Sequence, residues 1–185
     1  MSLEHAILGF LNDRPYSGYD LKKVFNASVR HFWPADQSQI YRTLSRMTEK
    51  GWTEIEVVRQ ESRPDRKQYH ITPTGKGELL RWLTTPLPPE AQRSAEMIQV
   101  FFAGELSDEE AIEMFERAAD MMRVGLAQYQ QIPREIEAYS QYTNSPRDFF
   151  FWKLTIDVGV HTLQSNLNFI ENLIQRIHNG ELPRN

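Results

Sequence analysis

A proline-rich break divides this 185-residue chain into two parts with different sequence patterns. The segment Thr84-Thr85-Pro86-Leu87-Pro88-Pro89 contains three of the ten prolines. Proline has no backbone N–H to donate, and it disfavours helical backbone in the residue before it. We therefore expect a linker at residues 86–89, between one domain formed by residues 1–85 and a second formed by residues 90–185.

The two parts also differ in net charge. Residues 1–85 contain 13 Lys and Arg against 10 Asp and Glu, a net charge of +3. Residues 86–185 contain 8 against 15, a net charge of −7, and the two together give the −4 of the whole chain. Because like charges repel, only the first part is suited to approach a phosphate backbone.

Several classes of protein are disfavoured by what the sequence lacks. It has no cysteine, so disulfides and zinc-thiolate sites are excluded. The N-terminus has no basic region typical of a signal peptide, and no apolar run approaches the roughly 20 residues that span a bilayer. We therefore expect a cytoplasmic protein.

Motifs of catalysis and metal binding are also missing. The chain has no Gly-x-Ser-x-Gly, phosphate-loop or dinucleotide-binding pattern. Its five histidines do not pair with one another at helical spacing, and His161 with Asp157 is interpreted as a helix-surface contact. We expect no enzymatic activity, no metal and no cofactor.

The first part has the order helix, helix, helix, hairpin, helix. Helix-start signals lie at Ser2, at Ser17 (Ser-x-x-Asp), at Asp36 (Asp-x-x-Gln) and at Thr72, which a proline follows. Residues Trp52–Val58 alternate as a strand does, and a second alternating run follows a polar turn. This order predicts a winged helix-turn-helix domain, in a chain that is mainly α with a small β-wing.

The third helix, expected at residues 36–50, has the pattern of a helix that contacts bases. Ile40, Leu44 and Met47 share one face at about 100° per residue. The opposite face presents Ser38, Gln39, Arg42, Ser45 and Arg46. In the major groove Gln pairs with adenine and Arg with guanine. The alternative is an ordinary amphipathic helix with a solvated outer face.

The predicted wing, residues 57–69, has a basic tip. Four cations, Arg59, Arg63, Arg66 and Lys67, lie within nine residues, together with two acids. Cations on a projecting hairpin are suited to contact phosphates. The alternative is a solvated turn.

Residues 1–83 resemble the PadR family of bacterial and archaeal transcriptional regulators. The matching segments, in order, are LEHAILGFL (3–11), SGYDL (17–21), QIYRTL (39–44), EKG (49–51) and RKQYHITPTG (66–75). The long acidic helical tail resembles the larger-tailed branch of this family, which includes virulence activators of the AphA type. The resemblance implies a winged helix-turn-helix DNA-binding domain followed by an all-helical dimerisation domain.

The resemblance also implies roles for individual residues. Tyr19 is placed to touch the DNA backbone, Gln39, Tyr41 and Arg42 lie at recognition positions, and Arg66 and Lys67 match the basic residues that lead into the second wing strand. Tyr41 borders the apolar face, so that core packing remains an alternative for it. The sequence departs from the family pattern in its aromatic segment VRHFWPA (29–35) and in the two acids of the wing.

The second part shows only helical periods. One apolar stripe consists of Ile112, Phe115, Ala119, Met122, Leu126 and Tyr129, and another of Ile156, Val160, Leu163, Leu167, Ile170, Ile174 and Ile177. Two long helices with such stripes need partners that bury them. We therefore predict an antiparallel or swapped homodimer in which Phe149 and the stripe from Ile156 to Ile174 form the interface.

The aromatic run Phe149-Phe150-Phe151-Trp152 has two interpretations. Consecutive aromatic residues occupy most of the circumference of a helix, which favours a place in the dimer core. The alternative is a pocket for a small apolar or aromatic effector, with Trp33, Phe101, Phe102 and Trp152 as its walls.

Together these patterns predict a sequence-specific transcriptional regulator that binds double-stranded DNA as a homodimer. Its two recognition helices would enter successive major grooves, about 34–36 Å apart, at an inverted repeat. The competing hypothesis is a winged-helix protein-interaction module without direct DNA readout. Salt dependence distinguishes the two, since release of phosphate counterions makes DNA affinity fall steeply with salt.

Overall fold

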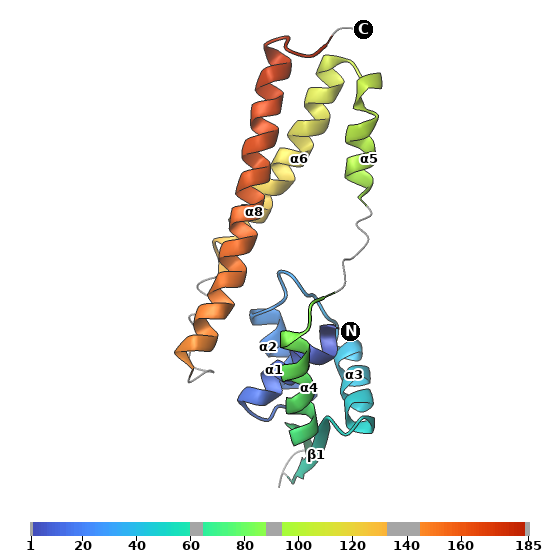
Figure 1. The fold of residues 1–185 in the computed structure, drawn as a ribbon, viewed down its shortest axis with the longest axis vertical. Helices are drawn as coiled ribbons and strands as arrows, with labels where there is room; N and C mark the ends of the chain where they lie inside the picture. Colours follow the sequence, from blue (N-terminus) through green and yellow to red (C-terminus); the bar gives the residue numbers. More distant parts are fainter. Residues whose placement is uncertain (1, 60–64, 88–93, 133–144, 184–185) are drawn as a thin grey trace. The chain divides into compact units, whose positions relative to one another are not determined.

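The computed structural model describes residues 2–59, 65–87, 94–132 and 145–183. The chain forms two compact units, Met1–Pro88 and Pro89–Asn185 (Figure 1). Pro88 and Pro89 of the predicted linker lie outside the described residues, as does Arg63 of the predicted wing tip.

The first unit has the winged-helix order that the sequence predicts. Its elements are α1 (Ser2–Asp13), α2 (Gly18–Ala27), α3 (Gln37–Glu49), β1 (Thr53–Val58), β2 (Arg66–Ile71) and α4 (Pro73–Thr84). The fold class, mainly α with a small two-stranded wing, is therefore confirmed.

Three helices of the first unit, α2, α3 and α4, begin where side chains cap them. The side chains of Ser17, Asp36 and Thr72 accept hydrogen bonds from backbone N–H groups in the first turns of α2, α3 and α4. Pro73 occupies the first position of α4, where its missing N–H costs nothing. These local bonds satisfy donors that a helix start otherwise leaves unpaired, which is why the sequence signals marked the starts correctly.

The core of the first unit lies between α1, α2 and α3. Its most deeply buried apolar side chains are Ile7, Leu8, Leu21, Phe25, Ile40, Leu44 and Met47. Burial of one such side chain contributes about 1.5–3 kcal/mol, so this cluster fixes α3 against the other two helices. The polar face of α3 is therefore held toward solvent.

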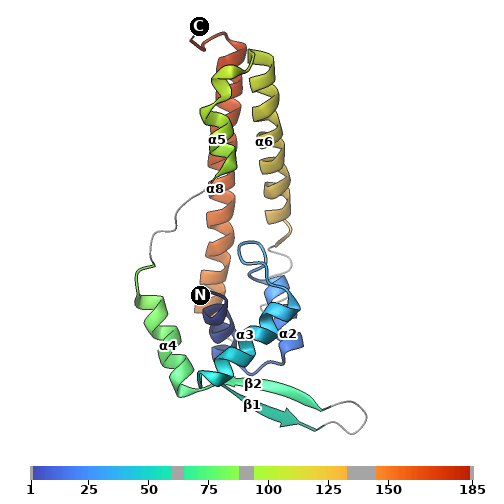
Figure 2. The ribbon, with the colours of Figure 1, turned by 90° about the vertical axis from the view of Figure 1, so that its right-hand side faces the viewer.

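The wing extends beyond this core (Figure 2). β1 and β2 pair antiparallel, with Thr53 opposite Ile71 and Ile55 opposite Tyr69. Thr53 and Tyr69 are buried at the base, whereas Ile55 and Val57 are exposed. The alternating pattern thus predicted the strand correctly, but only its base has a core to face.

A third backbone segment joins the base of the wing. Tyr16, in the loop between α1 and α2, pairs with Tyr69 through two backbone hydrogen bonds of 3.3 and 2.8 Å. No sequence pattern predicted that Tyr16 pairs with Tyr69, because a single paired residue produces no periodic pattern. It anchors β2 to the helical core.

The second unit is entirely helical in its described residues. It contains α5 (Ala95–Phe101), the short 3₁₀ helix η1 (Ala103–Glu105), α6 (Asp108–Tyr129) and α8 (Pro146–His178). α6 and α8 lie side by side in both ribbon views (Figures 1 and 2). Their contact includes a small core of Ala111 and Phe115 from α6 with Ile174 and Ile177 from α8.

The apolar stripe predicted for dimerisation is largely covered within the single chain. Ile156, Leu167 and Ile174 are buried, and Phe149, Val160, Leu163 and Ile170 are half-buried. Ile170 and Ile174 pack against residues of α6, and Leu163 lies against Gly125 of the same helix. A different set of apolar side chains on α8 remains exposed: Phe150, Phe151, Leu154, Val158 and Phe169.

Candidate nucleic-acid interface

The outer face of α3 is polar and exposed over its whole length. Ser38, Gln39, Arg42, Ser45 and Arg46 are all exposed, whereas Ile40, Leu44 and Met47 on the opposite side are completely buried. The structure therefore brings together the side chains that the sequence assigned to base contact, on one face of one helix.

The helix cap partly engages two of these side chains. The Oε1 atom of Gln39 accepts a hydrogen bond of 2.9 Å from the backbone N–H of Asp36, and the Ser38 hydroxyl donates to the Asp36 carboxylate at 2.7 Å. The backbone N–H of Gln39 and the Ser38 hydroxyl hold the pKa of Asp36 below its usual value. A two-bond contact of Gln39 with adenine would need the Oε1 atom to leave the cap.

The two arginines of α3 differ in how they are held. Arg46 lies 4.0 Å from the buried carboxylate of Glu4 and donates to Thr43 at 3.3 Å. Arg42 makes one long hydrogen bond of 3.4 Å, to the backbone carbonyl of Ser38. The guanidinium of Arg42 is therefore the better placed of the two to reach a base.

Tyr41 combines the two roles that the sequence left open. Its ring lies so close to Gly18 that a Cβ there would fall 2.7 Å from the ring carbon Cζ. The residue is nevertheless exposed. Burial, and secondarily the nearby Tyr41, raise the pKa of Tyr69 at the wing base. Tyr41 thus packs α3 against α2 and still presents a polar edge to solvent.

The first turn of α2 presents an aromatic ring and a cation together. Tyr19 is 56% exposed, and the Lys23 ammonium lies 4.5 Å from the centre of its ring. A tyrosine hydroxyl and a lysine ammonium on neighbouring side chains can both donate to phosphate oxygens. The sequence identified Tyr19 but not Lys23, although Lys23 follows it at the i,i+4 spacing that brings helical side chains together.

Arg66 and Lys67 of the wing have different surroundings. Arg66 forms an ion pair with Asp20 of α2. The same Asp20 carboxylate accepts a hydrogen bond of 2.6 Å from the Ser17 hydroxyl. Lys67 is exposed and makes no hydrogen bond or ion pair with any residue in the described ranges. Lys67 is therefore available to a phosphate, whereas Arg66 already joins the wing to the start of α2.

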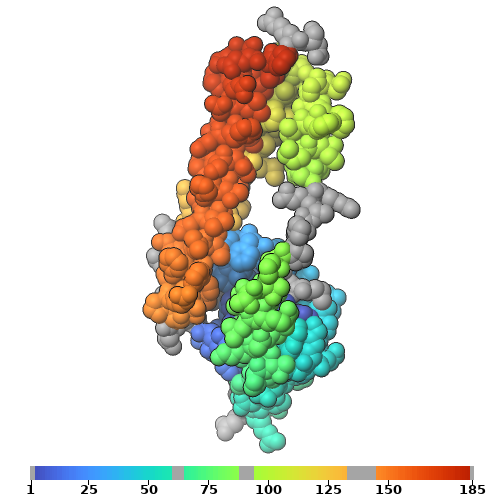
Figure 3. Space-filling view, viewed as in Figure 1, coloured from blue at the N-terminus to red at the C-terminus, as the bar shows by residue number. Residues whose placement is uncertain are grey.

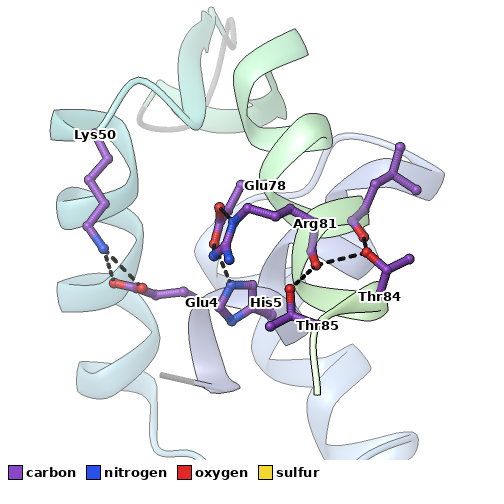
Figure 4. A network of polar contacts seen from close by, with 8 residues as sticks. Glu4, His5, Lys50, Glu78, Arg81, Thr84 and Thr85 are labelled. Atoms are coloured by element: carbon purple, nitrogen blue, oxygen red, sulfur yellow. Dashed lines mark hydrogen bonds and ion pairs between the residues drawn. The ribbon is translucent and has the colours of Figure 1, made fainter. Parts of the chain in front are cut away.

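Two polar contacts join α1 to its neighbours (Figure 4). The Lys50 ammonium lies 3.0 Å from both carboxylate oxygens of Glu4, which is only 2% exposed. On the other side of α1, His5 shares a 3.0 Å hydrogen bond with Glu78, and its ring stacks on Trp82 at 4.5 Å. These contacts hold α3 and α4 on either side of α1.

Acidification is expected to weaken the contact between α1 and α4. Hydrogen bonds from Arg81, and then from His5, lower the pKa of Glu78 from 4.5 to about 2. A carboxylate with a lowered pKa stabilises the folded state above its unfolded pKa and loses that contribution as pH falls from about 4.5 toward 2.

A Glu78→Gln variant tests this expectation by urea unfolding at pH 7 and pH 3. Because Arg81 is mostly exposed, we expect the variant to lose about 1–2 kcal/mol at pH 7 and less at pH 3. An equal loss at both pH values would contradict the assignment.

The four residues predicted to line an effector pocket do not meet within one unit. Trp33 is exposed in the turn between α2 and α3 of the first unit. In the second unit, Phe101 and Phe102 are exposed beside η1, and η1 shares a pocket with Ile177 of α8. Trp152 lies 25 residues before Ile177 on the same helix, a span of roughly 37 Å at about 1.5 Å per residue.

The described residues contain neither a membrane-spanning helix nor a metal-binding cluster. None of their helices is both long enough and apolar enough to span a membrane. Within the same ranges, no group of three or more His, Asp or Glu side chains is arranged to hold a metal ion.

Comparison with known proteins identifies the class of both units. Residues 7–81 match the model of the transcriptional regulator PadR-like family, and residues 92–178 match the virulence activator alpha C-terminal family. The chain is therefore a winged-helix transcriptional regulator with an added helical domain. It belongs to the PadR family, in the branch with the virulence-activator type of C-terminal domain.

Individual relatives agree with this assignment. The negative transcriptional regulator PadR of Bacillus subtilis is 27% identical over 176 residues, which cover 95% of this chain and 97% of that protein. A probable transcriptional regulator of Mycobacterium tuberculosis is 45% identical over 89 residues, 48% of this chain and 47% of that protein.

Solved structures extend the likeness to the whole fold. The structure of Bacillus subtilis PadR in complex with operator DNA is similar with a TM-score of 0.78 and 28% identity, and covers 96% of this chain and 99% of that one. The Vibrio cholerae virulence activator AphA shares the fold, with a TM-score of 0.69 and 24% identity over 95% of this chain and 98% of that one.

Proposed function

We propose that this regulator binds an inverted-repeat operator as a homodimer, with α3 of each copy in the major groove. The observation that supports this most directly is the geometry of α3, whose completely buried apolar face fixes its polar face toward solvent. The Bacillus subtilis relative, similar over nearly its whole length, has been seen in complex with operator DNA. Residues 1–85 would bind DNA and residues 90–185 would dimerise.

The contacts divide into base recognition and phosphate binding. We assign Arg42, with Ser38 and Gln39, to base edges, and Arg46 lies on the same exposed face. We assign Lys67 and Tyr19 to phosphates, together with Arg63, which the sequence also assigns to DNA. Arg66 acts chiefly by holding the wing on Asp20 of α2. Tyr41 contributes the polar edge of its packed ring.

The exposed apolar surface of the second unit supports the proposal of a homodimer. In α5 every residue is exposed, including Met97, Ile98 and Phe101. Figure 3 shows a long face of α8 that no other described element of its unit covers. Large exposed apolar surfaces mark interaction sites, and a second copy offers the same surface in return. An isologous dimer then places the two α3 helices about one turn of DNA apart.

An Arg42→Ala variant is expected to lose sequence preference. Loss of a two-bond contact with guanine costs about 1–3 kcal/mol at the cognate site and little at other sequences. In contrast, Lys67→Ala is expected to weaken all sequences by a similar factor and to lower the salt slope by about one. Fluorescence anisotropy with operator DNA and a scrambled duplex, over a salt series, measures both effects.

The same titrations decide between the proposal and its alternative. Equal loss of specific and non-specific binding in both variants would reject the division of roles. Absence of a salt-dependent affinity in the wild-type dimer would favour a protein-interaction module, for which the charge of −7 in residues 86–185 would be a contact surface.

We also propose that a small apolar molecule modulates DNA binding. The Bacillus subtilis relative has been solved in complex with p-coumaric acid, at 28% identity and a TM-score of 0.79 over 95% of this chain and 95% of that one. The sequence assigns Trp33, Phe101, Phe102 and Trp152 to such a molecule, and of these Phe101 and Phe102 lie together, with ring centroids 5.0 Å apart.

A further inference from the structure

A pocket of about 570 Å³ lies inside the second unit, where the start of α6 meets the end of α8. Ligand pockets in proteins commonly measure about 300–1,000 Å³ and have mainly apolar walls. The apolar walls here come from Leu106, Ala111, Phe115, Leu173, Ile177 and Leu182. None of these residues was assigned to a ligand pocket from the sequence, and Trp33 and Trp152 are not among the lining residues.

The wall formed by the residues after α8 is held in place by a tight turn. Gly180 has a φ of +70°, and its N–H donates to the carbonyl of Ile177 at 2.9 Å. The next N–H, of Glu181, donates to the carbonyl of Arg176 at 3.0 Å, which completes the helix-ending turn that glycine favours. Leu182 then packs back against the core of α6 and α8.

Side-chain bonds fix the same turn. The Glu181 carboxylate accepts hydrogen bonds of 3.1 Å from Asn179 and 3.1 Å from Arg176. These two partners lower the pKa of Glu181. On the α6 side, Ser107 and Glu110 cap the helix reciprocally at 2.9 and 3.2 Å. Both sides of the pocket are therefore built before any ligand arrives.

One charged side chain lines the pocket, and it is acidic. Asp108 is exposed and makes no hydrogen bond or ion pair with any residue of the described ranges, and the lining residues within those ranges include no basic side chain. The nearby acids Glu110 and Glu181 are already bonded. A carboxylate beside an apolar wall favours a ligand with an apolar body and one cationic group, and it repels an organic acid.

We propose that this pocket binds an apolar organic cation, with its ammonium on Asp108 and its hydrocarbon body against Phe115, Ile177 and Leu182. This inference rests on the proposed function for its regulatory meaning, because α6 and α8 are the helices of the proposed dimerisation domain. A ligand that joins their ends would bias any change in their packing that accompanies DNA binding. The binding itself does not depend on that meaning.

The test uses the full-length protein and two probes of similar shape. Isothermal titration calorimetry compares 4-phenylbutylamine with 4-phenylbutyrate, which carry opposite charges on the same apolar body. We expect the amine to bind at least tenfold more tightly. We expect Asp108→Asn to weaken the amine about tenfold, which corresponds to about 1.4 kcal/mol, close to the lower end of the range for a hydrogen bond to a charged group.

A matched control separates this contact from general charge. Glu109→Gln removes the same charge from the next residue of α6, which does not line the pocket, and it should leave amine affinity within twofold. Equal binding of amine and acid, no detectable amine binding, or equal effects of the two substitutions would overturn the proposal.

Operator binding by the same preparations keeps the two proposals distinguishable. If DNA binds but the amine does not, the pocket proposal fails and the proposed function stands. If the amine binds in the Asp108-dependent way but DNA does not, the pocket proposal stands and the proposed function fails.

Discussion

A Gly75→Ala variant is expected to destabilise the first unit by about 3 kcal/mol and to abolish operator binding at protein concentrations that saturate the wild type. A Cβ at Gly75 would overlap the carbonyl oxygen of Trp52 and lie 3.0 Å from its carbonyl carbon. Forced overpacking costs about 1–3 kcal/mol, and here the neighbour is backbone, which cannot rotate away.

The backbone of Trp52 is held firmly where it meets α4. Its carbonyl accepts a 3.0 Å hydrogen bond from the N–H of Thr72, and the Thr72 hydroxyl donates to the carbonyl of Gly51 at 2.6 Å. Thr72 also caps α4 by accepting from the N–H of Gly75. Any shift that relieved an alanine at position 75 would therefore break the junction between α3, the wing and α4.

Gly77 provides a matched control on the same helix. A Cβ at Gly77 would meet nothing within 4 Å. Because alanine is favoured over glycine in a helix by about 1 kcal/mol, Gly77→Ala should leave stability unchanged or raise it slightly. Urea unfolding followed by circular dichroism measures both variants. Equal stabilities for the two would show that α4 does not sit against Trp52 as described.

The sequence predicted the helices well because their signals are local. Ser17, Asp36 and Thr72 each cap a helix with a hydrogen bond to the backbone N–H three residues later. The residues that form the start of each helix are therefore the same few residues that predict it. The burial of Ile40 and Leu44 likewise follows from a period that a short window contains.

What the sequence could not show depends on residues far apart in the chain. Glu4 meets Lys50, and Asp20 meets Arg66, each across 46 positions. No residue near Arg66 in the sequence indicates that Asp20 of α2 will form an ion pair with its guanidinium. From the sequence, Arg66 was therefore predicted to contact a phosphate. The pairing of Tyr16 with Tyr69 of the wing was likewise not predictable from nearby residues. The candidate interface was thus predicted as a set of residues, but not how each is held.

The proposed dimer surface is a second case in which the sequence did not show which residues are covered by other parts of the chain. The sequence pattern identified one apolar stripe on α8 and assigned it to a partner, but α6 of the same chain packs against it. A second set, including Phe151, Val158 and Phe169, lies on the opposite side at about 100° per residue. A helix that is apolar on two opposite faces needs two neighbours, and α6 supplies only one.

A Val158→Glu, Phe169→Glu double variant is therefore expected to raise the dimer dissociation constant at least 100-fold. Both side chains are exposed in the single chain, at 58% and 71%, so the fold of each chain should not need them. In an isologous interface each substitution occurs twice, and burial of unpaired carboxylates is costly. The expected factor corresponds to about 2.7 kcal/mol. Sedimentation equilibrium measures the dissociation constant.

Operator affinity should fall when dimerisation is lost, because a monomer engages only one half-site. The control is Gln164→Glu, which adds the same charge at an exposed position on the flank between the two apolar faces of α8. It should leave both dimerisation and DNA affinity within about twofold, since surface substitutions usually cost less than about 0.5 kcal/mol. A double variant that remains a dimer would place the interface elsewhere, whereas a folded monomer that keeps full operator affinity would show that α8 joins two copies without positioning their α3 helices.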